Sequence, residues 1–125
     1  MIDHVSIAVR DLAVCSRFYE SVLATLGYAK LAVRPGTIGF GKKYPEFWLN
    51  ERRTMTPADP DSGAHVCLRA SSGEAVQAFH AAALRSGGTS DGAPGLRSGE
   101  IGGYYAAFIR DPDGNRIEAV TFIAG

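Results

Sequence analysis

The sequence repeats itself at one fixed spacing, and this repeat limits the possible folds more than any other feature of the chain. Four pairs of matching residues stand 61 positions apart, as residue 65 does from residue 4: His4 and His65, Phe18 and Phe79, Leu23 and Leu84, and Gly27 and Gly88. Both members of each pair fall at equivalent places in the expected order of elements. Internal similarity of this kind indicates two copies of one supersecondary unit.

The first half of the chain is expected to form a strand, a helix and three further strands. Residues 2–9 alternate between polar and apolar side chains, as a strand does. Residues 12–26 carry apolar side chains three and four positions apart, which indicates an amphipathic helix capped by Asp11 and ended by Gly27. The remaining strands are expected at residues 28–33, 37–41 and 47–49.

The second half is expected to follow the same order. A strand at residues 64–70 precedes a helix at residues 75–86, which Ser71 or Ser72 can cap. Residues 92–103 are rich in glycine, and this loop is either a plain connection or a mobile lid. The other expected elements are a loop-rich stretch at 89–101 with a short strand near 95–97, and strands at 104–110 and 116–123.

The stretch between the two halves has the composition of a linker. Residues 52–62 contain prolines and aspartates and show no apolar periodicity. A chain of 125 residues suits one domain. We therefore predict a single α+β domain over residues 1–125, made of modules 1–51 and 63–125.

Charge and composition argue against two classes of partner. Thirteen basic and thirteen acidic residues give a formal net charge of zero, which disfavours nucleic acid and charged membrane surfaces as partners. No apolar run approaches the ~20 residues of a membrane span. The chain enters a strand almost at once, so no signal peptide is expected. Cys15 and Cys67 do not form a disulfide framework, and a reducing cytoplasm is the expected location.

A turn and a strand near the end of the chain carry the first candidate site residue. Residues 111–120 read Asp-Pro-Asp-Gly-Asn-Arg-Ile-Glu-Ala-Val, in which proline and glycine favour a tight turn. Alternation along the following strand places Glu118 and Arg116 on one face, with apolar residues on the other. A buried carboxylate is costly unless it is paired or bound to a metal ion. Glu118 therefore marks a candidate site.

Together these features resemble the vicinal-oxygen-chelate superfamily, the group of glyoxalases, bleomycin resistance proteins and extradiol dioxygenases. The resemblance covers nearly the whole chain and is most specific at residues 111–118. It is carried by His4 in Ile-Asp-His-Val-Ser-Ile-Ala-Val, Phe18-Tyr19, His65, and Asp-Pro-Asp-Gly-Asn-Arg-Ile-Glu. It implies two βαβββ modules whose mixed sheets form a cup around a metal ion, with the helices outside, and usually a homodimer.

The resemblance implies that His4, His65 and Glu118 bind a divalent metal ion. The repeat gives the two histidines equal positions in paired modules, so pseudo-twofold symmetry is expected to bring them together. Two imidazoles and one carboxylate suit Fe(II), Mn(II), Ni(II) or Zn(II), and the sequence leaves the choice open. Taken alone, a strand histidine is more often a hydrogen-bonded core residue.

The chain departs from the four-ligand pattern of glyoxalase I, whose members carry a second glutamate on the fourth strand. The equivalent position falls at or near Trp48, which can neither bind a metal ion nor act as a base. Glu46, two residues earlier, is a weak substitute. The remaining three-ligand pattern is that of extradiol dioxygenases and of the thiol transferases that inactivate fosfomycin.

Further candidates lie on the strands expected to line the cup. One of Tyr104 and Tyr105 must face it, and the hydroxyl of either can bind a substrate oxygen or donate a proton, which makes both candidates for catalysis beside Glu118. The candidates for substrate binding are Trp48, Arg69, Arg116 and Cys67. An inward tryptophan is about as suited to stacking on a substrate ring as to packing in the core.

Two kinds of function stay open. The first is a metal-dependent enzyme that acts as a Lewis acid on a small substrate with vicinal oxygens, as a lyase, isomerase, dioxygenase or thiol transferase. The second is a non-catalytic protein that binds or sequesters a small planar molecule, as bleomycin resistance proteins do. The sequence leaves open the substrate and the physiological role. It also leaves open whether the site is completed within one chain or across a homodimer.

Overall fold

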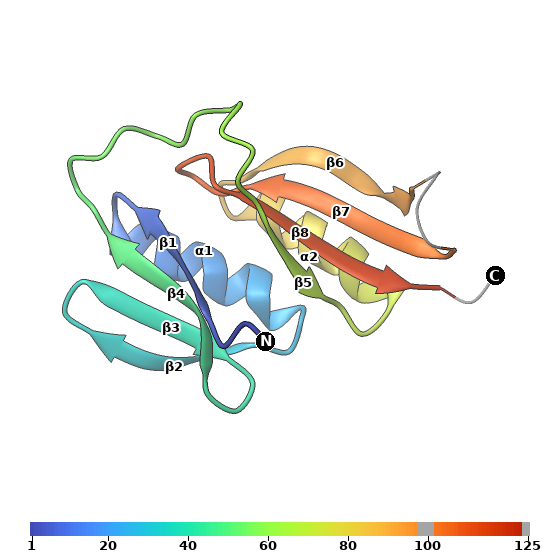
Figure 1. Ribbon diagram of the computed structural model, residues 1–125, viewed down its shortest axis with the longest axis horizontal. Helices are drawn as coiled ribbons and strands as arrows, with labels where there is room; N and C mark the ends of the chain where they lie inside the picture. The colour runs from blue at the N-terminus through green and yellow to red at the C-terminus, as the bar shows by residue number, and fades with distance from the viewer. Residues whose placement is uncertain (98–101, 124–125) are drawn as a thin grey trace.

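The computed structural model describes residues 1–97 and 102–123 and shows two β-sheets covered by two helices on one side (Figure 1). The first module contains β1 (Val5–Val9), α1 (Leu12–Ala24), β2 (Ala29–Arg34), β3 (Thr37–Gly41) and β4 (Pro45–Glu51). The second contains β5 (Val66–Arg69), α2 (Gly73–Arg85), β6 (Thr89–Leu96), β7 (Tyr104–Arg110) and β8 (Arg116–Phe122). Within those residues no helix is long and apolar enough to cross a membrane.

Both modules have the same strand order, which confirms the prediction of an α+β fold built from two tandem modules. The first sheet runs β1-β4-β3-β2 and the second β5-β8-β7-β6. In each sheet the first and last strands of the module are parallel, and the other pairs are antiparallel. The two mixed sheets stay separate, and the strands do not close into a barrel in the described part of the chain.

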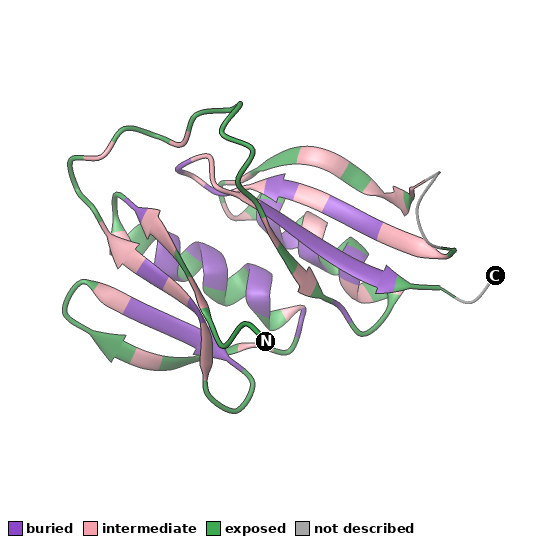
Figure 2. Ribbon diagram, in the orientation of Figure 1, coloured by how far each residue is buried: buried purple, intermediate pink, exposed green. Residues whose placement is uncertain are grey.

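Each helix begins at a side-chain cap and buries one apolar stripe. The carboxylate of Asp11 accepts a hydrogen bond from the backbone N–H of Val14, and the hydroxyl of Ser72 accepts one from that of Ala75. The buried stripes of the helices pack on the central strands, as Figure 2 shows. The core formed in this way includes Phe18, Tyr19, Phe40, Phe47, Phe79, Ile109 and Ile117.

The first strand is shorter than predicted, because it begins at Val5 and leaves residues 2–4 outside the sheet. In the parallel register Val5 lies beside Phe47, so Asp3 would fall beside Pro45. Proline has no backbone N–H to donate to a ladder, and pairing stops there. His4 therefore precedes the strand instead of lying on it.

The stretch expected to be mostly loop is largely a strand. β6 extends over eight residues despite three of them being glycine or proline at positions 92, 94 and 95. It is an edge strand with two register shifts, and edge strands tolerate bulges and proline because one side needs no ladder partner. Residues 98–101 of the expected loop lie outside the described residues.

The Asp-Pro-Asp-Gly-Asn turn before β8 joins the second module to the first. Asp111 is buried and accepts a 2.8 Å hydrogen bond from the hydroxyl of Tyr19 on α1. The side-chain amide of Asn115 donates to Asp111 at 2.9 Å and to the backbone oxygen of Ala8 at 2.9 Å. The backbone N–H groups of Asp113 and Asn115 also donate to Asp111. The turn thus binds β1 and α1 through a buried polar network.

Asp113 forms a second link across the same junction. Its carboxylate accepts hydrogen bonds from Nε of Arg10 at 2.6 Å and from the backbone N–H of Arg10 at 3.1 Å. The thiol of Cys15 donates to it at 3.4 Å. Burial alone would raise the pKa of Asp113, but the hydrogen bonds from Arg10 and Cys15 outweigh burial and hold that pKa below its usual value.

We expect the link through Asp113 to weaken in acid. Because the folded-state pKa is depressed, the stability that Asp113 contributes is present above the unfolded value of about 3.9 and is lost as the pH falls through the folded value. In urea, the free energies of unfolding of the native protein and of Asp113→Asn should therefore differ clearly at pH 7, and the difference should shrink as the pH falls below about 3.9. If the difference in free energy of unfolding between the two proteins stays constant across this pH range, the assignment is contradicted.

Candidate functional site

Glu118 is a buried carboxylate with a polar partner on each oxygen. It lies in the middle of β8 and is only 3% exposed. Nε2 of His65 lies 3.1 Å from Oε1, and the hydroxyl of Tyr104 donates a short hydrogen bond to Oε2. A buried charge needs such partners, because losing water is otherwise costly.

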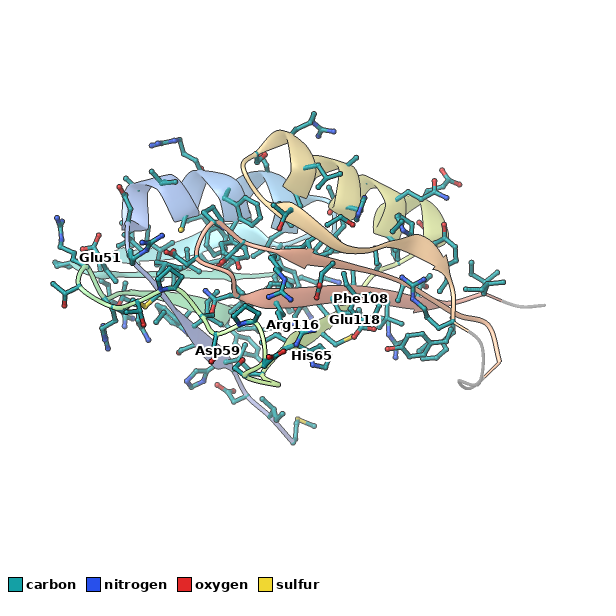
Figure 3. All side chains as sticks on the ribbon, turned by 90° about the horizontal axis from the view of Figure 1, so that it is seen from above. Glu51, Asp59, His65, Phe108, Arg116 and Glu118 are labelled. Atoms are coloured by element: carbon teal, nitrogen blue, oxygen red, sulfur yellow. The ribbon has the colours of Figure 1, made fainter. Side chains whose placement is uncertain are left out.

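The strand register explains why these groups meet. On β8, Glu118 and Arg116 alternate with Ile117 and Ala119, which lie in the core beneath the helices. Glu118 pairs with Cys67 on β5 and with Phe108 on β7, so the three side chains share the face away from the helices. We call this side the open face. Figure 3 shows the labelled His65, Arg116, Phe108 and Glu118 on the side of the sheet opposite the helices.

Both neutral acids beside Glu118 are held in their protonated forms. The hydrogen bond to Glu118, with burial, raises the pKa of the Tyr104 hydroxyl well above its usual value, so this group stays a donor. Burial, with the nearby charge of Glu118, raises the pKa of the Cys67 thiol to about 12. A neutral thiol is a poor nucleophile. Cys67 therefore acts as a small neighbour of the carboxylate.

The two candidate tyrosines lie on opposite faces of β7. Tyr104 is on the open face with Phe108, whereas Tyr105 packs against the core and its hydroxyl accepts a 2.9 Å hydrogen bond from the side-chain amide of Gln77 on α2. The structure therefore does not bring Tyr105 to Glu118. Arg69 is on the open face at the C-terminal end of β5, with its guanidinium 5.0 Å from the ring centre of Phe122.

Arg116 lines a small hollow together with His65, the partner of Glu118. The hollow has a volume of about 140 Å³ and is lined by His65, Asp91, Phe108, Arg116 and Ile117. Nε of Arg116 lies 3.2 Å from Asp91, which also pairs with Arg110 at 3.3 Å. The open face of the second module thus offers a carboxylate, a hydroxyl, an imidazole and a guanidinium within one group of side chains.

Of the three residues expected to bind a metal ion, His4 and His65 line one hollow of about 330 Å³, and His65 contacts Glu118. The side chain of His4 is 53% exposed and its Nδ1 lies 2.7 Å from the carboxylate of Asp3. Among the residues that the structure describes, no group of three or more His, Cys, Asp or Glu side chains is placed to hold a metal ion. His65 and Glu118 alone supply two donors. The side chains therefore do not fit a three-ligand centre within one chain.

In the first module, Trp48 takes the place that Glu118 has in the second. Ser6 pairs with Trp48 as Cys67, 61 positions later, pairs with Glu118. The ring lies over Gly39, where an added Cβ would come within 2.8 Å of it. Glu46, two residues earlier on β4, accepts a 3.2 Å hydrogen bond from the hydroxyl of Tyr28.

The ring of Trp48 borders a hollow of the first module. The guanidinium carbon of Arg34 lies 5.2 Å from the centre of the indole ring. The hollow measures about 430 Å³ and is lined by Asp3, His4, Ser6, Arg34, Thr37, Pro45, Trp48 and Asn50. A cation over an indole and polar side chains around it suit a flat, polar ligand.

Three residues of these sites were missed by the reasoning from sequence. Phe108 could have been found, since it alternates with Tyr104 on the same strand. Asp91 lies in a stretch that has the composition of a loop, so no periodic signal marks it. Arg34 ends a strand that is mostly exposed, and a charged residue there is ordinary.

Comparisons with known proteins agree with this architecture. The model of the Glyoxalase/Bleomycin resistance protein/Dioxygenase superfamily matches residues 1–119. A glyoxalase/bleomycin resistance protein from Albidiferax ferrireducens T118 is 35% identical, with a TM-score of 0.84 over 94% of this chain and 96% of that chain. No curated protein matches the sequence.

More distant solved structures share the fold. A glyoxalase/bleomycin resistance protein/dioxygenase family enzyme from Burkholderia phytofirmans PsJN is 19% identical, with a TM-score of 0.75 over 98% of both chains. The fosfomycin resistance protein FosX from Mesorhizobium loti is 15% identical, with a TM-score of 0.70 over 97% of this chain and 91% of that chain.

Proposed function

This chain belongs to the glyoxalase/bleomycin resistance protein/dioxygenase superfamily, and we propose that it is an enzyme that moves a proton on a small substrate with vicinal oxygens. The observation that carries the proposal is the carboxylate of Glu118, which is buried, held by His65 and Tyr104, and placed on the open face. Carboxylates in such surroundings are typical general acids and bases.

The proposed reaction begins with a carbon next to a carbonyl group. Glu118 takes a proton from this carbon, and the electron pair of the broken C–H bond moves onto the carbonyl oxygen to give an enolate. Nε2–H of His65, which bonds the Glu118 carboxylate, turns to the enolate oxygen once Glu118 is protonated, and Tyr104 keeps the carboxyl group in position. Return of the proton to the carbon regenerates Glu118.

Isotope exchange tests this proposal without knowledge of the natural substrate. The protein is incubated in D2O with hydroxyacetone, dihydroxyacetone and pyruvate, each of which has vicinal oxygens and exchangeable C–H bonds. Proton NMR then follows the loss of the C–H signals. We expect exchange with at least one compound to exceed the rate without protein. Rates that match the protein-free control for all three would overturn the proposal.

A metal-dependent form of the function, with Fe, Mn, Ni or Zn as Lewis acid, would need a third ligand beside His65 and Glu118. His4 lines a hollow with His65, but within the described residues no three such side chains are placed to hold an ion, so we derive no step through a metal ion. We expect the exchange rate to survive dialysis against EDTA followed by metal-free buffer. Loss of the rate on dialysis, with recovery on adding one divalent ion per chain, would instead support the metal-dependent form.

A second candidate function is the binding of a flat molecule without catalysis. The hollow around Trp48 favours it, because an indole, a guanidinium and several hydroxyl and amide groups meet there. In this reading Trp48→Ala abolishes binding, whereas Glu118→Gln leaves it intact. Fluorescence of Trp48, the only tryptophan of the chain, reports binding directly during titration with a panel of aromatic acids.

The proposal includes a homodimer in a reducing compartment, the cytoplasm. The resemblance to the superfamily supports the dimer, and two free cysteines support the compartment. Sedimentation equilibrium measures the mass in solution directly. A mass equal to that of one chain at micromolar concentrations would contradict the dimer.

A further inference from the structure

We propose that the substrate of this site is a small carboxylate, and that Arg116 binds its carboxylate group while Glu118 reacts with the neighbouring carbon. This inference rests on the proton-transfer function proposed above and names the class of substrate for the same site. It is carried by the ion-pair group of Arg116, Asp91 and Arg110 and by the hollow beside it.

Two guanidinium groups share a single carboxylate in this group. Oδ1 of Asp91 lies 3.3 Å from Nη2 of Arg110, and Oδ2 lies 3.2 Å from Nε of Arg116. No other carboxylate within the described ranges forms an ion pair with either arginine. Asp91 contacts Arg116 through Nε, and the structure gives no other hydrogen bond from this guanidinium within residues 1–97 and 102–123. The terminal Nη groups are therefore available to a ligand.

The position of Arg116 suits a substrate that also reaches Glu118. The two residues are separated by one position on β8, so both side chains lie on the open face. Figure 3 shows them close together with His65 and Phe108. The side chain of Arg116 is 33% exposed, so it can be reached from solvent. A carboxylate bound at Arg116 would hold the next carbon atoms of the ligand toward Glu118.

The shape and chemistry of the hollow favour a small acid over a large one. Its volume of about 140 Å³ has room for a carboxylate and a few carbon atoms. The Phe108 ring forms an apolar wall, whereas His65 and Arg116 supply donors. Guanidinium and carboxylate groups match in a planar, two-bond geometry that an ammonium group cannot reproduce.

Because the charges around Arg116 are nearly balanced, binding of an anion there depends on the geometry of its hydrogen bonds. Glu118 and Asp91 offset the charges of Arg110 and Arg116, so the group as a whole is close to neutral. An entering anion is therefore selected by hydrogen bonds from Arg116 and not by a general positive field. The competing explanation is that Arg116 only fixes edge strand β6 to β8 through Asp91. This explanation predicts no preference between an acid and its neutral amide.

The experiment compares acids with their amides in two assays. Isothermal titration calorimetry measures binding of lactate, lactamide and inorganic phosphate, and the D2O assay compares pyruvate with pyruvamide. We expect lactate to bind at least tenfold more tightly than lactamide, and pyruvate to exchange faster than pyruvamide. Phosphate that binds more tightly than lactate would overturn the assignment of a carboxylate.

Variants separate the binding role from the structural one. Arg116→Lys keeps the charge and the ion pair with Asp91 but loses the planar donor pair, and we expect lactate to bind about 10- to 100-fold more weakly. Arg116→Gln should lose the preference for lactate over lactamide. Arg85→Gln, which removes an exposed cation from α2, is the matched control and should bind as the native protein does.

The outcomes distinguish this inference from the proposed function. If pyruvate and pyruvamide exchange equally fast, the carboxylate assignment is wrong and the proton transfer stands. If no compound exchanges its C–H protons but lactate binds in preference to lactamide through Arg116, the binding role of Arg116 is supported and the proposed proton transfer is wrong. Lactate and lactamide that bind equally to the native protein overturn the inference even if both Arg116 variants fail to fold.

Discussion

Replacement of Asp111 by alanine is expected to lower the free energy of unfolding by roughly 3–5 kcal/mol, because several buried donors lose their acceptor together. The hydroxyl of Tyr19 is fully buried and donates to this carboxylate, as do the side-chain amide of Asn115 and two backbone N–H groups of the turn. An alanine removes this acceptor from all of them in the junction between the modules, and only the amide of Asn115 keeps another, the backbone oxygen of Ala8.

The matched control is Asp111→Asn. Burial raises the pKa of Asp111, and its hydrogen bonds act against that rise. Asparagine keeps one of the two acceptor oxygens, so it can still accept from Tyr19 while its NH2 group faces the two backbone donors, and we expect it to cost less than alanine. Urea unfolding at pH 7, followed by circular dichroism, measures both variants. Equal losses for the two would show that charge, and not hydrogen bonding, holds the junction together.

Glu118→Gln is expected to slow isotope exchange by roughly 10²- to 10⁴-fold, the contribution typical of one general acid–base group. Glutamine has nearly the same shape, and its side-chain oxygen can still accept the hydrogen bond from Tyr104. It cannot take a proton at neutral pH. The protein should therefore remain folded while the proton transfer is lost, and D2O exchange of pyruvate measures the rate.

Glu46→Gln provides the matched control for this prediction. Glu46 is also a strand carboxylate that accepts a hydrogen bond from a tyrosine hydroxyl, that of Tyr28. It has no hydrogen bond to Glu118, His65 or Tyr104 in the part of the chain that the structure describes. Its variant should exchange at the native rate. If both variants lose the rate to the same extent, Glu118 is not the reacting group.

The fold was predictable because the residues that repeat are ones that end helices or lie in the core. Phe18 and Phe79 lie in equivalent places on the two helices, and both are buried. The prediction was wrong where local pattern and pairing disagree. Residues 2–4 alternate as a strand does, but Pro45 would be their neighbour, and only the register reveals this.

The site was predictable only as far as single strands specify it. Alternation indicated that Glu118 and Arg116 share a face, but it could not decide between Tyr104 and Tyr105, because adjacent residues on a strand point to opposite sides. Asp91 reaches Arg116 through a bulged edge strand, and bulges have no reliable signal in sequence. How His4 of the first module lies relative to His65 and Glu118 of the second depends on how the two modules dock, which local pattern does not encode.

The docking of the two modules is one-sided, and this has a consequence for how the chain can be divided. The turn at residues 111–115 of the second module holds β1 and α1 of the first, whereas the equivalent turn at residues 42–44 is exposed. Protease cleavage within residues 52–62 should therefore leave two fragments that co-purify. Each fragment alone should fail to fold, and mixing them after denaturation should restore one native complex. The two halves are complementary partners and are no longer interchangeable copies.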